Sequence, residues 1–423
     1  MKKNLVRNKK IIFTIGLVLV SVLYLFVRFY KLNELVGFRL DQGVHLLETK
    51  NMFDDRKIRL VGPMSLSKSF DNRYLYIGAN YYYVLGIIGL VSQWNPLIIT
   101  IIFSLIEFIF YLFFVFFLER KFNLFWSLLI FGFIAVSPYL VIHSRFFWNP
   151  HLLIPLSILV LFLSEKYFLK KEAKYLFLMA FFWGFAFACH YSAVFWGLFF
   201  IWILFKSKQF KKIKTYLIII LGFLLGDLPW FIFEIRHNFY NTKTLFYIFT
   251  KSSSGSEMTS HYFVFPLLIF IVWFFLLVLS KLKNKTQTNF VLIIVLILGF
   301  LVQNKIFKNY APLDKISGWN YVDQQKVVDL IVKDGCPKNF EVAATVQGDT
   351  RAYDLRYLLN LKNCEPMGVE EYPKAEKLFL IAPANRPLET ETVWEVTSLG
   401  KFKINKQEKL NSEVVFYELE KIK

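Results

Sequence analysis

The chain of 423 residues is 56% hydrophobic and 19% aromatic, and its formal net charge is +19. No soluble domain needs that much apolar surface. The excess comes in long runs, each able to cross a hydrocarbon core of roughly 30 Å as a helix of about 20 residues. The runs are continuous rather than alternating, so the sequence predicts membrane-spanning helices and excludes a transmembrane barrel.

The positive charge is a topology signal and not a nucleic-acid footprint. From Asn304 to the end of the chain, eighteen basic residues cancel eighteen acidic ones. The excess therefore lies in the preceding part, mostly in short loops, and Lys and Arg accumulate in short cytoplasmic loops of membrane proteins. We expect membrane lipids as partners and no nucleic acid.

The first apolar run extends from Ile11 to about Tyr30 and follows five basic residues. A cleaved signal peptide is the alternative, but Arg28-Phe29-Tyr30-Lys31 comes where a small-residue cleavage site would be needed. The pattern predicts an uncleaved first helix that enters the plasma (inner) membrane from the cytoplasm.

The segment from Tyr74 to Trp94 decides the topology. It is apolar enough to span, but it also carries Asn80, three consecutive tyrosines and three glycines. If it spans, the later basic loops face outward. If it lies along the outer interface, they face the cytoplasm with the N-terminus, as the charge bias favours. These loops hold Arg120-Lys121, Lys166–Lys174, Lys206–Lys214 and Lys281–Lys285.

The predicted fold is therefore a mainly α, polytopic bundle of about nine spans. One stretch from Tyr175 to Phe205 would be about 46 Å long as a single helix, too long for one crossing. We predict two short helices there, with a turn sunk below the outer surface. The spans are Ile11–Tyr30, Leu97–Leu118, Leu124–Ile142, Leu152–Leu169, Tyr175–Cys189, Ala193–Phe205, Tyr216–Ile235, Tyr262–Ser280 and Asn289–Gln303.

This map gives a membrane domain (1–303), with a long first outer loop (31–96), and an extracytoplasmic tail domain (304–423). The tail alternates helix-like and strand-like runs, which predicts a small α/β domain. Cys336 and Cys364 both lie in it, and an extracytoplasmic location permits a disulfide, although sequence does not show that they meet. The runs are Val322–Lys333, Phe340–Val346, Arg351–Leu361, Lys377–Ile381, Lys401–Lys406 and Glu413–Glu418.

The first outer loop offers a candidate acid and histidine. At helical spacing Asp41, His45 and Glu48 share one face. An acid and a histidine that face a cavity could act as a general base. Alternatively, Asp41 is a helix N-cap and the other two lie on a solvated face.

Two outer turns offer candidate phosphate ligands. Arg145 follows a predicted span and could bind phosphate oxygens, or it could extend to lipid headgroups. His190 lies between two short helices, where it could donate to a phosphate or make a structural hydrogen bond. No His or Cys spacing typical of a metal site occurs.

Two acids fall inside predicted spans. Asp227 comes shortly before Pro229, and Glu107 is similarly deep. Intramembrane acids are functional candidates, but Asp227 could instead satisfy backbone groups freed by the proline, and Glu107 could be protonated and hydrogen-bonded. Glu234 and Arg236 follow at the outer end, as an interfacial pair or as contacts to a ligand headgroup.

Taken together, these motifs resemble the GT-C membrane glycosyltransferases, closest to the protein O-mannosyltransferase and lipid A aminoarabinose transferase types. The resemblance covers roughly Met1 to Gln303 and depends on the order and sidedness of the motifs. They are Arg39-Leu40-Asp41-Gln42, Gly62-Pro63, Tyr81-Tyr82-Tyr83, Ser144-Arg145-Phe146-Phe147-Trp148-Asn149-Pro150, His190-Tyr191-Ser192 and Leu228-Pro229-Trp230.

The resemblance implies an inverting transfer of a sugar from a polyprenyl-phosphate donor to a hydroxyl acceptor outside the cytoplasm. The acceptor would be a glycan, a lipid or a protein. Asp41 matches the family's first-loop acid and would be the general base on the acceptor. The resemblance implies that Arg145 and His190, with Arg236, hold the lipid phosphate.

Other positions of the motifs would line or support the same cavity. The family often has Glu after the first-loop Asp, whereas this chain has Gln42, which leaves a divalent metal as an open possibility. Glu48 or Asp71 could supply a second carboxylate. Some relatives have an acid near the position of Asn149, which is an amide here. The cavity residues are thus His45, Glu48, Asp71, Tyr82, Asn149 and Glu234.

Two other classes of protein remain as alternatives. A transporter or lipid flippase would concentrate polar groups near the midplane, around Asp227 and Glu107, with paired discontinuous helices. A non-catalytic scaffold would present the tail domain and would not need Asp41, Arg145 and His190 to share a cavity.

Overall fold

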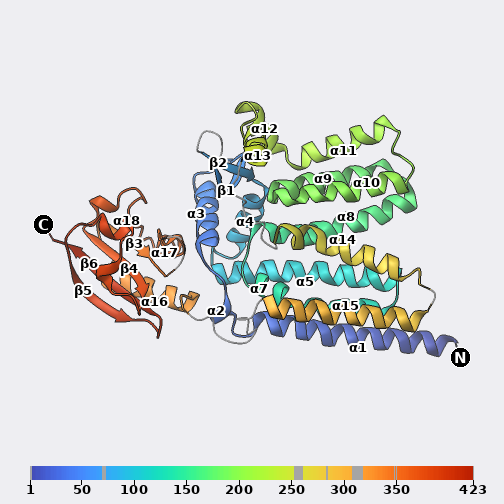
Figure 1. Ribbon diagram of the computed structural model, residues 1–423, viewed down its shortest axis with the longest axis horizontal. Helices are drawn as coiled ribbons and strands as arrows, with labels where there is room; N and C mark the ends of the chain where they lie inside the picture. The colour runs from blue at the N-terminus through green and yellow to red at the C-terminus, as the bar shows by residue number, and fades with distance from the viewer. Residues whose placement is uncertain are drawn as a thin grey trace. The chain divides into compact units, whose positions relative to one another are not determined.

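The computed structural model describes residues 2–68, 73–251, 261–282, 284–306, 318–346, 348 and 350–422 (Figure 1). The chain is mainly helical and forms two compact units. The first combines residues 1–28, 52–87 and 102–310, and the second combines 29–51, 88–101 and 311–423. The second unit is larger than the predicted tail domain, because two segments from the first hundred residues belong to it.

Within the described residues, five helices are long and apolar enough to cross a membrane. Two more form a pair, α11 (Ile213–Gly226) and α12 (Leu228–Arg236), which would be a sixth span with a bend of 83°. The predicted membrane character is thus supported by five to six helices. The five are α1 (Lys2–Phe29), α5 (Pro96–Lys121), α8 (Leu153–Lys170) with its preceding turn η1 (Asn149–Leu152), α14 (His261–Leu279) and α15 (Lys285–Ile306).

Three further predicted spans coincide with shorter apolar helices. The third predicted span is α6 (Leu124–Val136) followed by α7 (Pro138–His143), and the fifth is α9 (Ala173–Cys189). The sixth is the short turn η2 (Tyr191–Phe195) continued by α10 (Trp196–Lys206). A 13-residue helix is about 20 Å long, less than the hydrocarbon thickness, so the count of nine stays a prediction.

The segment from Tyr74 to Trp94 contains a short apolar helix, and its position at the outer interface stays a prediction. Its helix, α4 (Asn80–Val91), has 12 residues and is about 18 Å long. The segment does not begin as a helix, however. Tyr74–Gly78 is a strand, β2, which pairs antiparallel with β1 (Val61–Lys68). The sequence analysis missed this hairpin.

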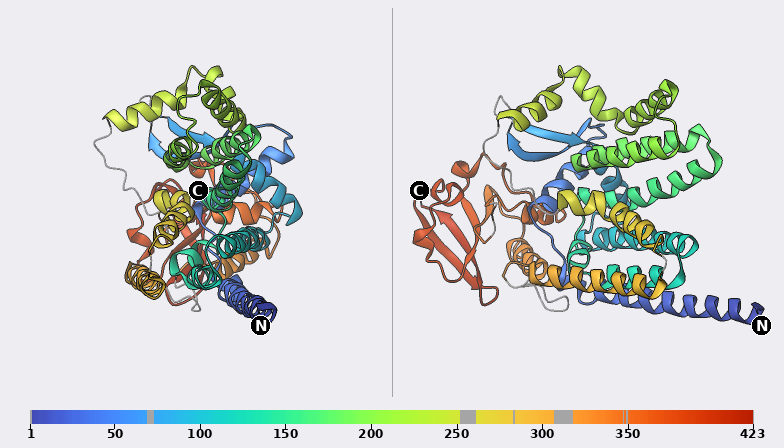
Figure 2. Two further views of the ribbon diagram at one scale, coloured as in Figure 1. Left: turned by 90° about the vertical axis from the view of Figure 1, so that its right-hand side faces the viewer. Right: turned by 45° about the vertical axis from the view of Figure 1, so that its right-hand side comes forward.

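Helices α9 and α11 of the first unit pack closely side by side (Figures 1 and 2). A Cβ atom at Gly222 would lie 2.6 Å from the carbonyl oxygen of Phe177, and one at Gly226 would clash with Phe181. Gly184 on α9 makes the reciprocal approach to Phe223. Gly222 and Gly226 are four residues apart, the small-residue spacing that lets helices in membranes approach closely.

The second unit contains a four-stranded sheet with strand order β3-β4-β6-β5. Strands β3 and β4 are parallel, and the other two pairs are antiparallel. All six elements predicted for the tail are present. They are α16 (Tyr321–Val332), β3 (Phe340–Ala344), α17 (Tyr353–Asn360), β4 (Lys377–Pro383), β5 (Phe402–Lys409) and β6 (Val414–Lys421).

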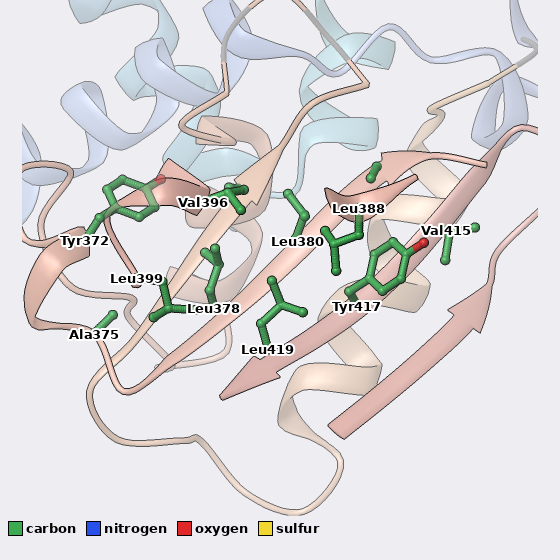
Figure 3. Close-up of a cluster of buried hydrophobic side chains, with 12 residues drawn as sticks. Tyr372, Ala375, Leu378, Leu380, Leu388, Val396, Leu399, Val415, Tyr417 and Leu419 are labelled. Atoms are coloured by element: carbon green, nitrogen blue, oxygen red, sulfur yellow. The ribbon is translucent and has the colours of Figure 1, made fainter. Parts of the chain in front are cut away.

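An apolar core lies on one face of this sheet (Figure 3). Alternate residues of β4 and β6 point into it, as the two-residue period of a strand requires. A buried ion pair joins Arg356 on α17 to Glu341 on β3. The Arg356 guanidinium also donates to the Tyr372 hydroxyl (3.0 Å) and the Met367 carbonyl (2.7 Å). The core side chains of β4 and β6 include Leu378, Leu380, Val415, Tyr417 and Leu419.

The tail elements pack on the first-loop segment of the same unit. The side-chain amide of Gln324 on α16 donates to the Phe38 carbonyl at 2.8 Å. The Phe38 ring lies 5.8 Å from that of Tyr321 and 5.9 Å from that of Tyr357. The helix that follows Phe38 is α3 (Leu40–Asp54). A Cβ atom at Gly43 of this helix would lie only 2.5 Å from the carbonyl oxygen of Tyr353, the first residue of α17, so only glycine fits there without a shift.

Cys336 and Cys364 form a disulfide, which answers the question that the sequence left open. The bridge joins the loop before β3 to the loop after α17, and 28 residues separate the two cysteines. It therefore closes a loop that includes the Arg356–Glu341 pair.

Reduction of this disulfide should destabilise the second unit by about 3–4 kcal/mol, because a loop of this length regains chain entropy when it opens. The free energy of unfolding of the full chain, measured by urea titration with and without a reductant, tests this. A variant with both cysteines replaced by serine should not respond to the reductant. Equal stability of the oxidised and reduced proteins would contradict the prediction.

Gly43→Ala should also destabilise this unit, by about 1–3 kcal/mol, because the new methyl group meets the backbone of α17. Gly132→Ala on α6 is the matched control, since no atom lies within 4 Å of its Cβ position and alanine favours a helix. Thermal unfolding of both variants in detergent should separate them. An unchanged melting temperature for Gly43→Ala would show that α3 and α17 do not depend on this contact.

Candidate functional site

The turn between α9 and η2 is the centre of the candidate site in the first unit. His190 adopts an extended conformation between these helices and serves as the N-cap of η2. Its Nδ1 atom accepts a hydrogen bond from the Ser192 backbone N–H at 3.3 Å and lies 2.7 Å from the Ser192 hydroxyl oxygen. The structural hydrogen bond that the sequence analysis offered as an alternative is therefore present.

His190 is neutral in this setting. Burial, with a smaller contribution from the neighbouring His261, lowers the pKa of His190 to about 3. Because Nδ1 accepts from a backbone N–H, the ring proton of the neutral form lies on Nε2. No described residue bonds to Nε2, so His190 retains one hydrogen-bond donor for a ligand.

The motif around Asn149 meets this turn. The buried Asn149 side chain donates to the Cys189 carbonyl at 2.8 Å. The preceding residue, Trp148, packs its ring 4.5 Å from that of His261, and the His261 ring lies 5.6 Å from that of His190. The structure therefore brings together two of the predicted site residues, Asn149 and His190.

Arg145 has a different environment from either of those expected. Its side chain is buried, with 4% of its surface exposed. The guanidinium donates to the Val27 carbonyl at 2.6 Å, close to the end of α1. The last carbonyls of a helix lack partners within the helix, so Arg145 caps α1.

A second arginine, which the sequence analysis did not select, makes the converse contact. Arg28 near the end of α1 is 1% exposed and donates to the carbonyls of Ile134 (3.0 Å) and Ala135 (2.9 Å) at the end of α6. It also lies 3.4 Å from the centre of the Tyr24 ring. No local sequence pattern identifies this role, because the partners on α6 lie 106 and 107 residues further along the chain.

The third motif meets the same turn from the break between α11 and α12. The Trp230 indole N–H donates to the Tyr191 hydroxyl at 3.1 Å. That hydroxyl donates in turn to the Tyr76 carbonyl on β2. On the other side of the break, the Asn80 side chain donates to the Gly226 carbonyl at 2.8 Å.

Asp227 lies at this break and is fully buried. The sequence analysis offered a capping role for it, but its side chain makes no cap hydrogen bond. Neither carboxyl oxygen has a hydrogen-bond partner among the described residues. A Cβ atom at Gly78 would lie 2.7 Å from Oδ1, so only glycine leaves room for this carboxyl group beside β2.

Tyr82 is buried at the start of α4, where its ring lies 6.1 Å from that of Tyr81. Tyr81 in turn approaches Phe103, which approaches Phe147 of the Arg145 motif. The tyrosine motif thus belongs to the core of the first unit through aromatic packing.

Glu234 and Arg236 do not form the predicted pair in the described part of the chain. Glu234 is buried and accepts from the backbone N–H groups of Asn241 (2.9 Å) and Thr242 (2.8 Å). It also accepts from the Thr242 hydroxyl at 2.7 Å. These contacts cap α13 (Tyr240–Lys251), whereas Arg236 is exposed at the end of α12.

Asp41, His45 and Glu48 belong to the second unit, where all three lie on α3 as predicted. Asp41 is exposed in the first turn of the helix, one residue past its start, so it is not the N-cap. His45 is buried rather than solvated. Burial lowers the pKa of His45 to about 4, against an opposing effect of the Asp41 charge. Asp71 lies outside the described residues.

The described residues contain no group of three or more His, Cys, Asp or Glu side chains that could hold a metal ion. Neither a protein-family model nor a curated protein matches the chain.

Glu234→Ala should destabilise the protein by about 1–2 kcal/mol, because the N-terminus of α13 loses its carboxylate cap. Glu234→Gln should lose less, since an amide oxygen still accepts two of the bonds. Lys243→Gln, exposed on α13, is the control and should stay within about 0.5 kcal/mol. Amide hydrogen exchange over 240–251 measures the effect, and unchanged protection in Glu234→Ala would rule the cap out.

Proposed function

We propose that this chain is an inverting membrane glycosyltransferase. It transfers a sugar from a polyprenyl-phosphate donor to a hydroxyl acceptor on the extracytoplasmic side of the plasma (inner) membrane. The proposal includes nine spans, a cytoplasmic N-terminus and an extracytoplasmic tail. The apolar helices of the first unit support the membrane part of it.

The observation that carries the proposal is the meeting of three sequence motifs at one turn. Asn149 donates to the carbonyl of Cys189, directly before the His190-Tyr191-Ser192 motif, and Trp230 donates to the Tyr191 hydroxyl, so the motifs around 144–150 and 228–230 both bond to this turn. These segments are far apart in sequence, and each belongs to the set of motifs that resembles the GT-C transferases. Their contact supports the proposal that they form one site.

The residues suggest a division of labour in the reaction. The departing polyprenyl phosphate gains negative charge as the glycosidic bond breaks, and preorganised hydrogen-bond donors stabilise such charge. His190 supplies one such donor through Nε2, and because its ring is neutral it donates a hydrogen bond without adding a positive charge. Arg145 is held rigidly by its contact with α1, which suits a residue that contributes positive charge at a fixed position.

Asp41 is the base in this proposal. It is exposed in the first turn of α3, so an acceptor hydroxyl can reach it without displacing the core. The hydroxyl proton passes to the Asp41 carboxylate while the oxygen attacks the anomeric carbon from the face opposite the phosphate. His45 lies one helical turn away and is buried, so it supports the helix rather than competing for the proton.

A lipid flippase is the second candidate, and Asp227 is the observation that favours it. A fully buried carboxyl group without a described partner, at a helix break of 83°, resembles the discontinuous helices of transporters. In the transferase proposal, Asp227 is instead a buried group packed against Gly78 of β2.

Asp41→Asn should lower the transfer rate by about 10²–10⁴-fold and leave donor binding intact, because only the base is lost. The assay uses purified full-length protein with a panel of polyprenyl-phosphate sugars and identifies the labelled product. Asp55→Asn is the control. Asp55 is exposed in the same loop, and its one ion pair with a described residue is with exposed Lys57, so this variant should retain full activity.

Full activity of Asp41→Asn would show that another group is the base. A wild-type protein that transfers no sugar from any donor, but moves a donor lipid across the bilayer of proteoliposomes, would favour the flippase instead. If Asp227→Asn then abolished that movement, the second candidate would replace the first.

A further inference from the structure

A basic cavity lies in the first unit at the end of the bundle opposite the proposed donor turn. Its volume is about 1040 Å³, and α1, α5, α6, α14 and α15 contribute to its wall. Its polar lining holds five cations and one carboxylate. The charged residues are Lys9, Lys10, Arg120, Lys121, Lys285 and Glu119.

Most of these cations are available for a ligand. Lys121 forms an ion pair with Glu165 at 3.0 Å. The other four cations form no ion pair with any described residue. Lys9 and Lys10 lie at the start of the apolar part of α1, and Arg120 lies at the end of α5, so their charges come from separate helices. Cations on separate helices thus converge on this cavity, and the one carboxylate in its described lining, Glu119, leaves a net positive charge there.

The rest of the lining is apolar and aromatic. Phe13 and Phe116 line the cavity and are in edge-to-face contact, 5.8 Å apart. Trp126 also lines it, and its indole N–H donates to Asn289 at 2.7 Å. An aromatic ring with a polar tip is the side chain favoured at the level of lipid headgroups.

The apolar part continues along the membrane-exposed face of α1. Ile12 lines the cavity and is 58% exposed, and the same helix face continues with Ile15 at 55% and Leu19 at 64%. A molecule with an anionic head and a long hydrocarbon chain fits both parts at once. A free anion would contact only the cationic part of the cavity and not the apolar face of α1.

We propose that this cavity binds the headgroup of an anionic phospholipid, with an acyl chain along α1. The positive-inside bias explains why cations lie at this end, but it does not explain why they surround one cavity with an apolar continuation. Basic pockets between membrane helices bind anionic headgroups for this reason. The site is independent of the proposed transferase activity.

The test compares two triple variants of the full-length protein. Lys10→Gln, Arg120→Gln and Lys285→Gln together remove three cations from the cavity. Lys206→Gln, Lys211→Gln and Lys212→Gln remove three exposed cations from the loop before α11, which does not line the cavity. Both variants lose the same net charge from basic loops that we predict to face the same side of the membrane.

Binding of phosphatidylglycerol, titrated into the detergent-solubilised protein and counted as adducts by native mass spectrometry, should fall about fivefold for each cavity cation lost. The triple cavity variant should therefore bind on the order of a hundredfold more weakly, and the loop variant should match the wild type. Phosphatidylcholine should bind weakly to all three proteins. Replacing the same cavity residues, Lys10 and Lys285, by arginine should preserve binding.

Three outcomes would overturn the proposal. If both triple variants lose binding equally, the attraction is to the basic end as a whole. If neither loses it, the lipid binds elsewhere. If inorganic phosphate at equal concentration displaces the lipid completely, the cavity is an anion site without a role for the acyl chain.

Discussion

The first unit depends on how its helix ends are satisfied away from water. A carbonyl left without a partner in an apolar environment costs several kilocalories per mole, and the last four carbonyls of every helix have none within the helix. Two buried arginines supply the missing partners. Arg28, near the end of α1, donates to the last carbonyls of α6, and Arg145 donates to a carbonyl near the end of α1. Guanidinium groups suit this role because each carries five N–H donors in a rigid plane.

The candidate site inherits its rigidity from these contacts. Arg145 and Asn149 lie four residues apart, so the arginine that caps α1 also fixes the segment from which Asn149 reaches Cys189. Glu234 has a similar effect on the other side, because it joins α12 to α13. Residues that resembled ligand contacts in the sequence thus hold the framework around His190, which keeps a free Nε2 donor.

Sequence patterns predicted the positions of helices and strands better than they predicted the contacts between them. Apolar runs and charge bias identified every long apolar helix, and alternation identified all six tail elements, because those signals are local. The β1–β2 hairpin was missed because Tyr74–Gly78 was read together with the apolar helix that follows it, and the irregular pairing of β1 with β2 leaves no clean alternation in the sequence. Arg28 was missed because its significance depends on the end of α6, a hundred residues away, and no local pattern encodes that partner.

The contact between Gly43 on α3 and the backbone of α17 joins a segment that is synthesised early to one that is synthesised late. The backbone of α17, against which α3 packs, belongs to one of the last elements of the chain, whereas α3 is among the first. Loop closure over such a distance is slow and comes late in folding. The helix that carries Asp41 therefore lacks its packing partner until the tail has been made, so a prematurely terminated chain would expose that acid on an unsupported helix.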